Sequence, residues 1–321
     1  MFLHTLKKHR KRLLLLLGVT LLAALIIASD TDKIVRTLLS LTLAQITMLV
    51  LLQLLTIFLI NVQWTLLAKH LGRPLSFANA LEMNFLGTFF ESVTPVVKAG
   101  GEAYKFAYLK TKGESASEAS ALIGAQKTFS MLSFVALALF SLLLAGGLGL
   151  FDRGTFISLW FAFGALVLFM AFLYGLYRFM ARKQTTAPSK PKRFVLNLKN
   201  SLAPLGRKKS RFFLYIPLGL AIWFVYALKT FYVLHSFSID LSYPLAASVT
   251  YITYMVNMLP LSPGGLGTFE GTMSGLFVLL GVSAAVAIGA TLALRLATFW
   301  LMLLLSAAYL LVKHFWRRKP L

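Results

Sequence analysis

Long blocks of apolar residues limit what this chain can fold into more than any other feature of its sequence. The blocks cover residues 13–28, 38–68, 116–149, 155–177, 212–234, 243–260 and 284–312. A helix of about 20 apolar residues crosses the roughly 30 Å hydrocarbon core of a bilayer. Helices satisfy their backbone hydrogen bonds internally, and the blocks lack the polar–apolar alternation of a membrane barrel. We therefore predict an all-α polytopic membrane protein.

The composition supports this class and excludes others. Only 13% of the 321 residues are charged, whereas a soluble domain carries about 25%. The net charge of +22 would suggest nucleic-acid binding in a soluble protein, but here we assign the cations to cytoplasmic loops, where they set orientation. We expect membrane lipids as partners and no nucleic acid. Because cysteine is absent and the histidines lie at segment ends, we expect no metal and no cofactor.

The placement of positive charge predicts the topology. Lys and Arg are concentrated in residues 1–12, in residues 178–211, which hold no acid, and in residues 313–321. All three segments lie on the cytoplasmic side only if residues 74–112 enter and leave the membrane by the same face. We therefore predict a re-entrant or broken-helix hairpin at 74–112. We place the protein in the bacterial or archaeal cytoplasmic membrane, with both termini cytoplasmic.

Three local expectations accompany this topology. Residues 13–28 follow a basic segment, but no Ala-x-Ala site comes after them, so we predict a retained first helix rather than a cleaved signal. Residues 30–33 are expected to form an external turn before a helix over 38–68. Lys229, near the outer end of a helix over 212–236, is expected to extend toward the lipid headgroups.

The two halves of the chain carry similar short patterns in the same order. The matching stretches are 75–80 with 241–246, 95–102 with 260–270, and 113–116 with 281–284, followed by Lys127 and Arg295. We interpret these matches as an internal repeat. Each half then holds three crossings and one hairpin, and this odd number turns the second half upside down.

The repeat also predicts the division of the chain. The parts are 1–149 with a hairpin at 74–112, 150–312 with a basic loop at 178–211 and a hairpin at 243–282, and a basic tail at 313–321. This gives about six spanning helices plus two re-entrant hairpins, or eight spans if the hairpins are counted as helices. Inverted repeats with discontinuous helices are common in transporters, whose sites form near the membrane midplane.

Proline and glycine residues predict where each hairpin breaks, because proline removes an amide donor and glycine permits close backbone approach. The predicted helix-break residues are Pro95, Gly100, Gly101, Pro260, Pro263, Gly264, Gly265 and Gly267. At such a break, free amides and the following helix N-terminus can hold an anion such as phosphate. The alternative interpretation is an ordinary loop or a close contact between helices.

Two cations are predicted to lie deep in the membrane. Lys127 and Arg295 stand 11–12 residues into their helices, which is about 17 Å at 1.5 Å per residue. A central cation costs roughly 2.5–3.5 kcal/mol on insertion scales, so each needs a partner. The partner is either an ion-paired acid, Glu102 or Glu270, or an anionic headgroup.

The candidate substrate-binding residues combine these charges with polar residues of the hairpins. They are Lys127, Arg295, Glu102, Glu270, Lys98, Asn84 and Asn257. As alternatives, Glu102 and Glu270 carry protons for coupling, and Glu82 and Glu91 line a cytoplasmic vestibule. We find no catalytic motif and therefore do not expect an enzyme.

Residues 84–102, 113–127 and 254–295 resemble the lysylphosphatidylglycerol synthase transmembrane-region family, which includes the membrane half of the multiple peptide resistance factor. The Pro-Gly-Gly-x-Gly-x-x-Glu pattern at 263–270 and the following Arg295 carry most of the similarity. The resemblance implies a flippase-like membrane protein. In that resistance factor a separate soluble domain makes the aminoacylated lipid, and residues 313–321 form only a basic tail here, so we do not expect aminoacyl transfer.

The leading functional hypothesis is flippase-like translocation of an anionic or aminoacylated phospholipid or of a polyprenyl-linked lipid. One alternative is a membrane-embedded lipid-modifying enzyme or its subunit, and another is a small-solute or ion transporter. Beyond lipids, the partners we consider are a second copy of the chain and a separate lipid-synthesising enzyme.

Overall fold

The computed structural model describes residues 31–93, 99–147, 209–258 and 262–317, together with the isolated positions 154, 164, 196–197, 200 and 202. Every regular element within these ranges is a helix. The predicted helices over 13–28 and 155–177, and the basic loop at 178–211, lie almost entirely outside the described residues.

The predicted apolar blocks within the described residues are mainly helical, and further short helices lie between them. The helices are α2 Thr31–Leu39, α3 Leu43–His70, α4 Phe77–Val93, α5 Ala99–Thr111, α6 Ala116–Gly147, α9 Lys209–Ser236, α10 Tyr243–Val256, the 3-10 turn η1 Pro263–Gly265, α11 Thr268–Leu279, α12 Ala284–Arg295, the π-helix η2 Leu296–Trp300 and α13 Leu301–Arg317. Within the described ranges, four stretches are long and apolar enough to cross a membrane: Leu43–His70, Ala116–Gly147, Leu214–Ser236 and Ala284–Lys313. The prediction of an all-α polytopic membrane protein is confirmed.

The predicted turn at residues 30–33 is wrong for the described part, because α2 begins at Thr31. The apolar run that starts at residue 38 is instead interrupted between α2 and α3. Thr42 caps α3 there: its Oγ1 accepts a hydrogen bond from the Gln45 amide at 3.3 Å, and its own amide donates to Gln45 Oε1 at 2.8 Å. Such a reciprocal capping box starts a new helix.

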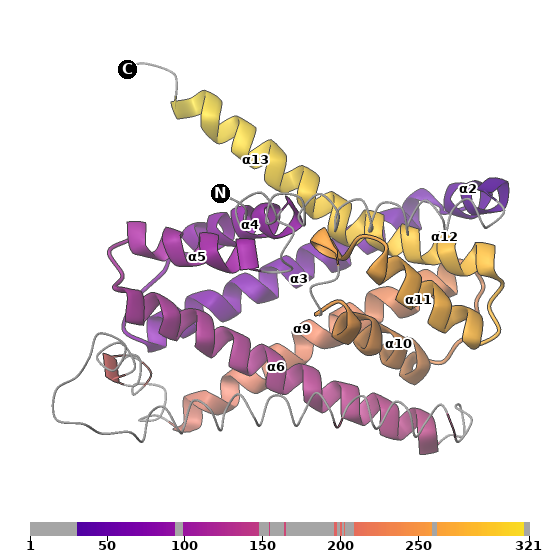
Figure 1. Cartoon of the computed structure of the whole chain (residues 1–321), viewed down its shortest axis with the longest axis horizontal. Coiled ribbons are helices and arrows are strands. Elements are labelled where there is room, and N and C mark those ends of the chain that lie inside the picture. Colours follow the sequence, from indigo (N-terminus) through magenta and orange to yellow (C-terminus); the bar gives the residue numbers. More distant parts are fainter. Residues whose placement is uncertain are drawn as a thin grey trace, which may run out of the picture.

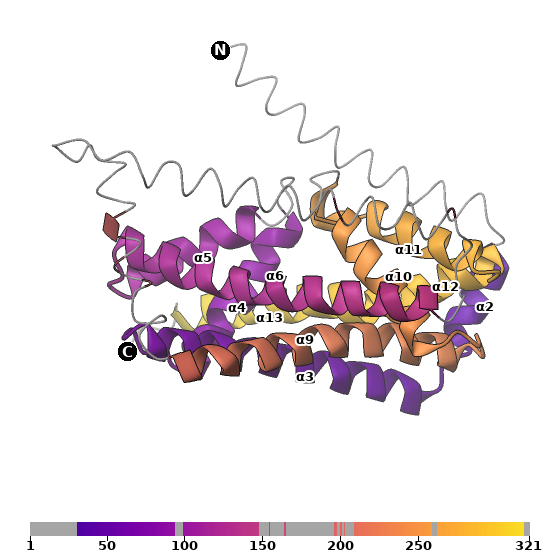
Figure 2. The same ribbon diagram turned by 90° about the horizontal axis from the view of Figure 1, so that it is seen from below.

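The long helices form the frame of the molecule. α3 packs beside α9, and α6 packs across α9 and α10. Figure 2 shows α3 and α9 running side by side along the long axis, with α6 above them. Helices from the first half of the chain therefore pack directly against helices from the second half.

Four short helices form two hairpins that pack against these long helices. α4 packs against α5 toward one end of the molecule, and α10 packs against α11 toward the other end (Figure 1). These helices have 17, 13, 14 and 12 residues. At 1.5 Å per residue they span about 18 to 26 Å, which is less than the hydrocarbon core of about 30 Å.

The two hairpins begin and end at opposite ends of α3. Arg73, just before α4, forms ion pairs with Glu114, at 3.5 Å, and with Glu118, both just after α5. Near the start of α3, Gln45 Nε2 donates to the Ser236 carbonyl at 3.5 Å, where the chain passes from α9 to α10. The hydrophobic cluster at that end also joins residues 38 and 41 to residues 241, 280 and 282, which flank α10 and α11.

Gly100 and Gly101 were predicted as helix-break residues, but the structure places both in the first turn of α5. A Cβ at Gly101 would lie 2.7 Å from the Gly87 carbonyl oxygen and 3.0 Å from the Glu91 Cβ. Gly101 therefore permits the close approach of α4 and α5. The adjoining break at 94–98, with Pro95, lies outside the described residues.

We expect Gly101→Ala to destabilise the protein by about 1–3 kcal/mol, because the added methyl forces α4 away from α5. The control is Gly124→Ala in α6, where a Cβ would have nothing within 4 Å. That change should be neutral or stabilising by up to about 1 kcal/mol, since alanine is the better helix former. Thermal unfolding in detergent, followed by circular dichroism, measures both. Equal melting temperatures for the two variants would contradict the close-packing role.

Candidate functional site

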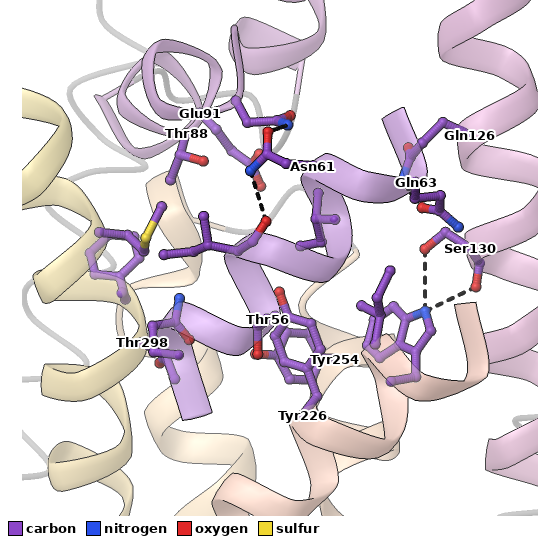
Figure 3. Close-up of a pocket in the computed structure, with 18 of the residues that line it drawn as sticks. Thr56, Asn61, Gln63, Thr88, Glu91, Gln126, Ser130, Tyr226, Tyr254 and Thr298 are labelled. Carbon is purple, nitrogen blue, oxygen red and sulfur yellow. Dashed lines mark hydrogen bonds between the residues drawn. The ribbon is translucent and has the colours of Figure 1, made fainter. Parts of the chain in front are cut away.

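A polar pocket of about 280 Å³ lies between the helices. Its lining comes from α3, α4, α5, α6, α9, α10, η1, α12, η2 and α13, so both hairpins and every long helix contribute. Figure 3 shows threonine, asparagine, glutamine and tyrosine side chains pointing into it from several helices. The α3 residues that line it, 53 to 64, belong to the middle of an apolar spanning helix.

The buried amides of α3 form one wall of the pocket. Asn84 Nδ2 donates to Asn61 Oδ1 at 2.9 Å, which links α4 to α3. Gln126 Nε2 donates to Gln63 Oε1 at 3.1 Å, which links α6 to α3. Sequence reasoning selected Asn84 but missed the amides of α3. Their signal was available, because amide side chains in the middle of an apolar span are expensive unless they face protein or water.

A basic cluster lies on the α5 and α6 side of the pocket. Glu102 Oε1 lies 2.9 Å from Lys127 Nζ and 3.2 Å from Lys105 Nζ, so one carboxylate is shared by two ammonium groups. The Lys127 side chain is 42% exposed. Lys105, which sequence reasoning missed, lies 5.5 Å above the Trp64 ring. The cluster carries an excess of positive charge, and Lys127 keeps donor capacity facing the pocket.

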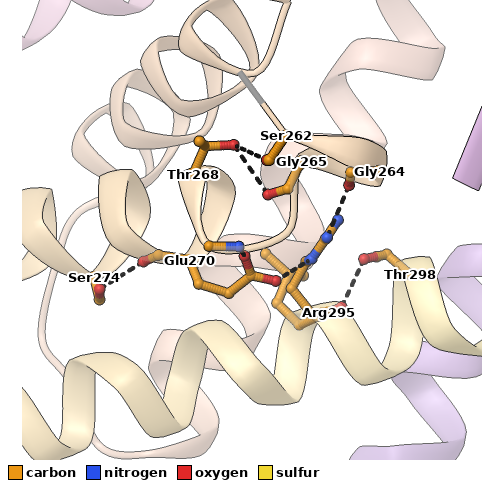
Figure 4. Close-up of polar contacts among 10 residues, drawn as sticks. Ser262, Gly264, Gly265, Thr268, Glu270, Ser274, Arg295 and Thr298 are labelled. Carbon is orange, nitrogen blue, oxygen red and sulfur yellow. Dashed lines mark hydrogen bonds and ion pairs between the residues drawn. The ribbon is translucent and has the colours of Figure 1, made fainter. Parts of the chain in front are cut away.

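Arg295 is bound to the second hairpin at its break (Figure 4). Its Nε donates to Glu270 Oε1 at 2.7 Å, and its Nη2 donates to the Gly264 carbonyl at 3.0 Å. Its side chain is only 5% exposed, and its guanidinium lies 4.1 Å from the centroid of the Phe299 ring. This cation holds the break in place through Nε and Nη2, and it also lines the pocket.

The break before α11 is built from glycines in the left-handed region. Gly264, Gly265 and Gly267 have φ of 59°, 70° and 77°. The Gly267 amide donates to Glu270 Oε2 at 2.7 Å. The anion at this helix N-terminus is therefore the chain's own carboxylate. Pro263 belongs to η1, and Pro260 lies outside the described residues.

The break of the second hairpin touches the first hairpin. A Cβ at Gly264 would lie 3.4 Å from the Ser92 carbonyl oxygen, near the end of α4. At Gly265 a Cβ would collide with Asn257 Oδ1. Asn257 lines the pocket, and its Oδ1 is buried without a hydrogen-bond partner among the described residues. The two hairpins thus meet at the pocket, with an acceptor left open.

The two remaining acids of the first hairpin have different surroundings. Glu91 lines the pocket. Glu82 instead forms an ion pair with Lys313 of α13 and accepts a hydrogen bond from the Tyr108 hydroxyl at 3.1 Å. Lys98 lies outside the described residues. Within the described ranges, no group of three or more His, Asp or Glu is placed to hold a metal ion.

The expectation that Lys229 extends toward the headgroups is wrong. Its side chain is fully buried, with 0% exposure. Nζ donates to Gln53 Oε1 at 2.7 Å and lies 4.3 Å above the Tyr226 ring. The buried amide on α3 and the ring on its own helix hold the ammonium group inside the protein, directly behind the pocket wall.

The fold and the site define a polytopic α-helical membrane protein with a charged polar pocket between apolar spans. A family model described as the lysylphosphatidylglycerol synthase TM region matches residues 15–306, so the chain belongs to this family, and the predicted resemblance is confirmed. The chain is similar to a UPF0104 membrane protein of Methanothermobacter thermautotrophicus, with 23% identity over 94% of this chain and 95% of the relative. A UPF0104 membrane protein of Pyrococcus horikoshii is 25% identical over 94% of this chain and 97% of the relative.

The two ion pairs should differ in their importance for stability. Glu270→Gln leaves the buried Arg295 without a counter-charge, so we expect a loss of about 3–5 kcal/mol. Glu102→Gln is the matched change, and it should cost less, about 1–3 kcal/mol, because Lys127 is 42% exposed although the more buried Lys105 also loses its counter-charge. Denaturant titration in detergent compares the two variants. If Glu270→Gln were no more destabilising than Glu102→Gln, the role of Arg295 in holding the helix break in place would be refuted.

Proposed function

We propose that this protein moves a lipid across the membrane, with the headgroup passing through the polar pocket while the acyl chains stay in the bilayer. One observation carries the proposal: charged side chains of the first hairpin and of the helices α6 and α12, together with amide side chains from both hairpins, surround one pocket in the middle of apolar spans. Polar groups at such depth are expensive and usually mark a substrate or ion pathway. The proposed substrate is an anionic or aminoacylated phospholipid or a polyprenyl-linked lipid.

The size and chemistry of the pocket suit a headgroup better than a whole lipid. Its volume of about 280 Å³ is near the lower end of small-molecule sites, which run from about 300 to 1,000 Å³. Lys105 and Lys127 share a single acid and offer ammonium donors to a phosphate. Open amide atoms of Asn257 and Gln63 supply further polar contacts.

The acyl chains have a route beside the pocket. Thr298, Phe299 and Met302 line the pocket from η2 and α13. On the same stretch of helix, Leu296 and Leu304 are exposed on the outer surface. The pocket and the apolar surface are therefore separated by one helix, so a headgroup can enter while its chains remain outside.

The opposed hairpins suggest how access alternates. Each hairpin acid pairs with a cation 25 residues further along the chain, Glu102 with Lys127 and Glu270 with Arg295. Together with the hairpin ends at opposite ends of α3, this favours two re-entrant units of one inverted repeat. In transporters with that design, the halves move against each other around a site at the midplane. We propose that opening alternates between the two hairpins in the cytoplasmic membrane.

A second candidate function follows from the family's description as part of a synthase. The protein would then be the membrane subunit of a lipid-modifying enzyme, working with a separate catalytic partner. Formation of a covalent lipid product by the purified protein and its partner would favour this function. Uptake of a small solute or ion into lipid vesicles, independent of lipid movement, would favour a third class.

We expect the purified protein in liposomes to accelerate the transbilayer movement of phosphatidylglycerol that carries a fluorophore on an acyl chain. Quenching of the fluorophore by external dithionite measures this movement. Lys127→Met should slow this movement roughly 10- to 100-fold, because it removes a charged hydrogen-bond donor. The control is Lys110→Met, which removes an exposed lysine at the end of α5 and should leave the rate unchanged. The same rate in empty liposomes, or full activity of folded Lys127→Met, would exclude the proposed function.

A further inference from the structure

Lys229 is a buried cation that the proposed pathway does not yet use. It lies about two turns before the C-terminal end of the spanning helix α9, and its side chain is fully buried. Its polar contacts among the described residues are the neutral Gln53 amide and the Tyr226 ring. None of the ion pairs within the described ranges includes it. A buried ammonium without a nearby acid is costly, so it keeps its proton only when a counter-charge comes close.

The charges around the pocket balance without Lys229. The charged residues that line it or pair with its lining are Lys105, Lys127, Arg295, Glu91, Glu102 and Glu270. Three are cations and three are acids. In its protonated form, Lys229 therefore adds to the site, as far as the described residues go, one positive charge that no protein group offsets.

The electrostatic field of Lys229 acts on the pocket because only one layer of side chains separates the two. Gln53 and Tyr226, which contact its ammonium group, are themselves pocket-lining residues. Charges act more strongly on each other across a wall of packed protein than in bulk water. A headgroup in the pocket therefore experiences this extra charge, although the ammonium does not line the pocket itself.

We propose that Lys229 is a specificity-determining residue that makes the pocket select a headgroup with one net negative charge, of the phosphate monoanion class, over a zwitterionic headgroup of similar size. The inference deepens the proposed function and rests on it for the lipid source of that anion. In this inference, Lys229 selects through the charge balance of the pocket and not through a direct contact with the ligand.

Binding in an uncharged detergent tests the charge preference without requiring transport. Dihexanoyl-phosphatidylglycerol is the monoanionic probe, and dihexanoyl-phosphatidylcholine is the zwitterionic probe. Calorimetric titration gives both affinities. The change in tryptophan fluorescence, to which Trp64 and Trp223 in the pocket lining contribute, reports binding independently. We expect the wild-type chain to bind the anionic probe roughly tenfold more tightly.

Substitutions at residue 229 separate charge from structure. Lys229→Met removes the charge with little change in side-chain length, and Lys229→Gln removes the charge but keeps a donor for Gln53. Both should bring the ratio of the two affinities close to one, whereas Lys229→Arg should preserve the preference. Lys110→Met, the control for loss of a distant positive charge, should also preserve it. Thermal unfolding identifies the variants that are folded, and Lys229→Gln decides the matter if Lys229→Met is not.

The outcomes distinguish this inference from the proposed function. Equal wild-type affinities for both probes, or an unchanged ratio in folded Lys229→Gln, would overturn the charge selection. Preferential anion binding without lipid movement in liposomes would uphold the charge selection and end the translocation proposal. Glycerophosphoglycerol supplies the same anion without acyl chains. If it binds as tightly as the lipid probe, the site serves a free anion, and the lipid part of the inference is lost.

Discussion

The buried ion pair between Arg295 and Glu270 is the interaction on which the shape of the site depends. The guanidinium holds the Gly264 carbonyl, and the carboxylate takes the Gly267 amide, so one pair satisfies both sides of a break in the helix. Unpaired backbone groups at this depth would be prohibitively expensive. Because the break is fixed, its glycines lie against the end of α4 and close the pocket. The first hairpin has a looser version of this arrangement, since Glu102 serves two lysines and one of them faces the pocket.

The four spans within the described residues could be predicted because the signal for a span is local. Twenty consecutive apolar residues identify a span without knowledge of its neighbours, and the charge of the loops indicated that residues 74–112 return to the side they leave. The contacts of Arg73 with Glu114 and Glu118 agree with such a return. The short helix α2 was missed because it carries Asp, Lys and Arg and resembles a polar turn in composition.

The details of the site could be predicted only where both partners had a recognisable pattern. Charge and spacing predicted that Lys127 and Arg295 need partners, with Glu102 or Glu270 as one alternative and an anionic headgroup as the other. The location of Lys229 could not be predicted, because its partner Gln53 is 176 residues away in sequence. A lysine near a helix end has the same local pattern whether it reaches headgroups or a buried amide, and only the packing of α3 against α9 decides between them. Gly101 was assigned to a break for a similar reason, since glycine serves turns and close helix contacts alike.

The π-helix between α12 and α13 has a consequence for the registry of the last helix. A π-helical turn amounts to one extra residue inserted into an α-helix, and each residue of an α-helix advances the direction of its side chains by about 100°. From Leu301 onward, the side chains therefore point in directions rotated from those that an uninterrupted continuation of α12 would give. Met302 faces the pocket, and Lys313 reaches Glu82 on α4, only because of that offset. Homologues that lack one residue here would present a different face of the helix to the first hairpin, and their pockets would be closed by other side chains.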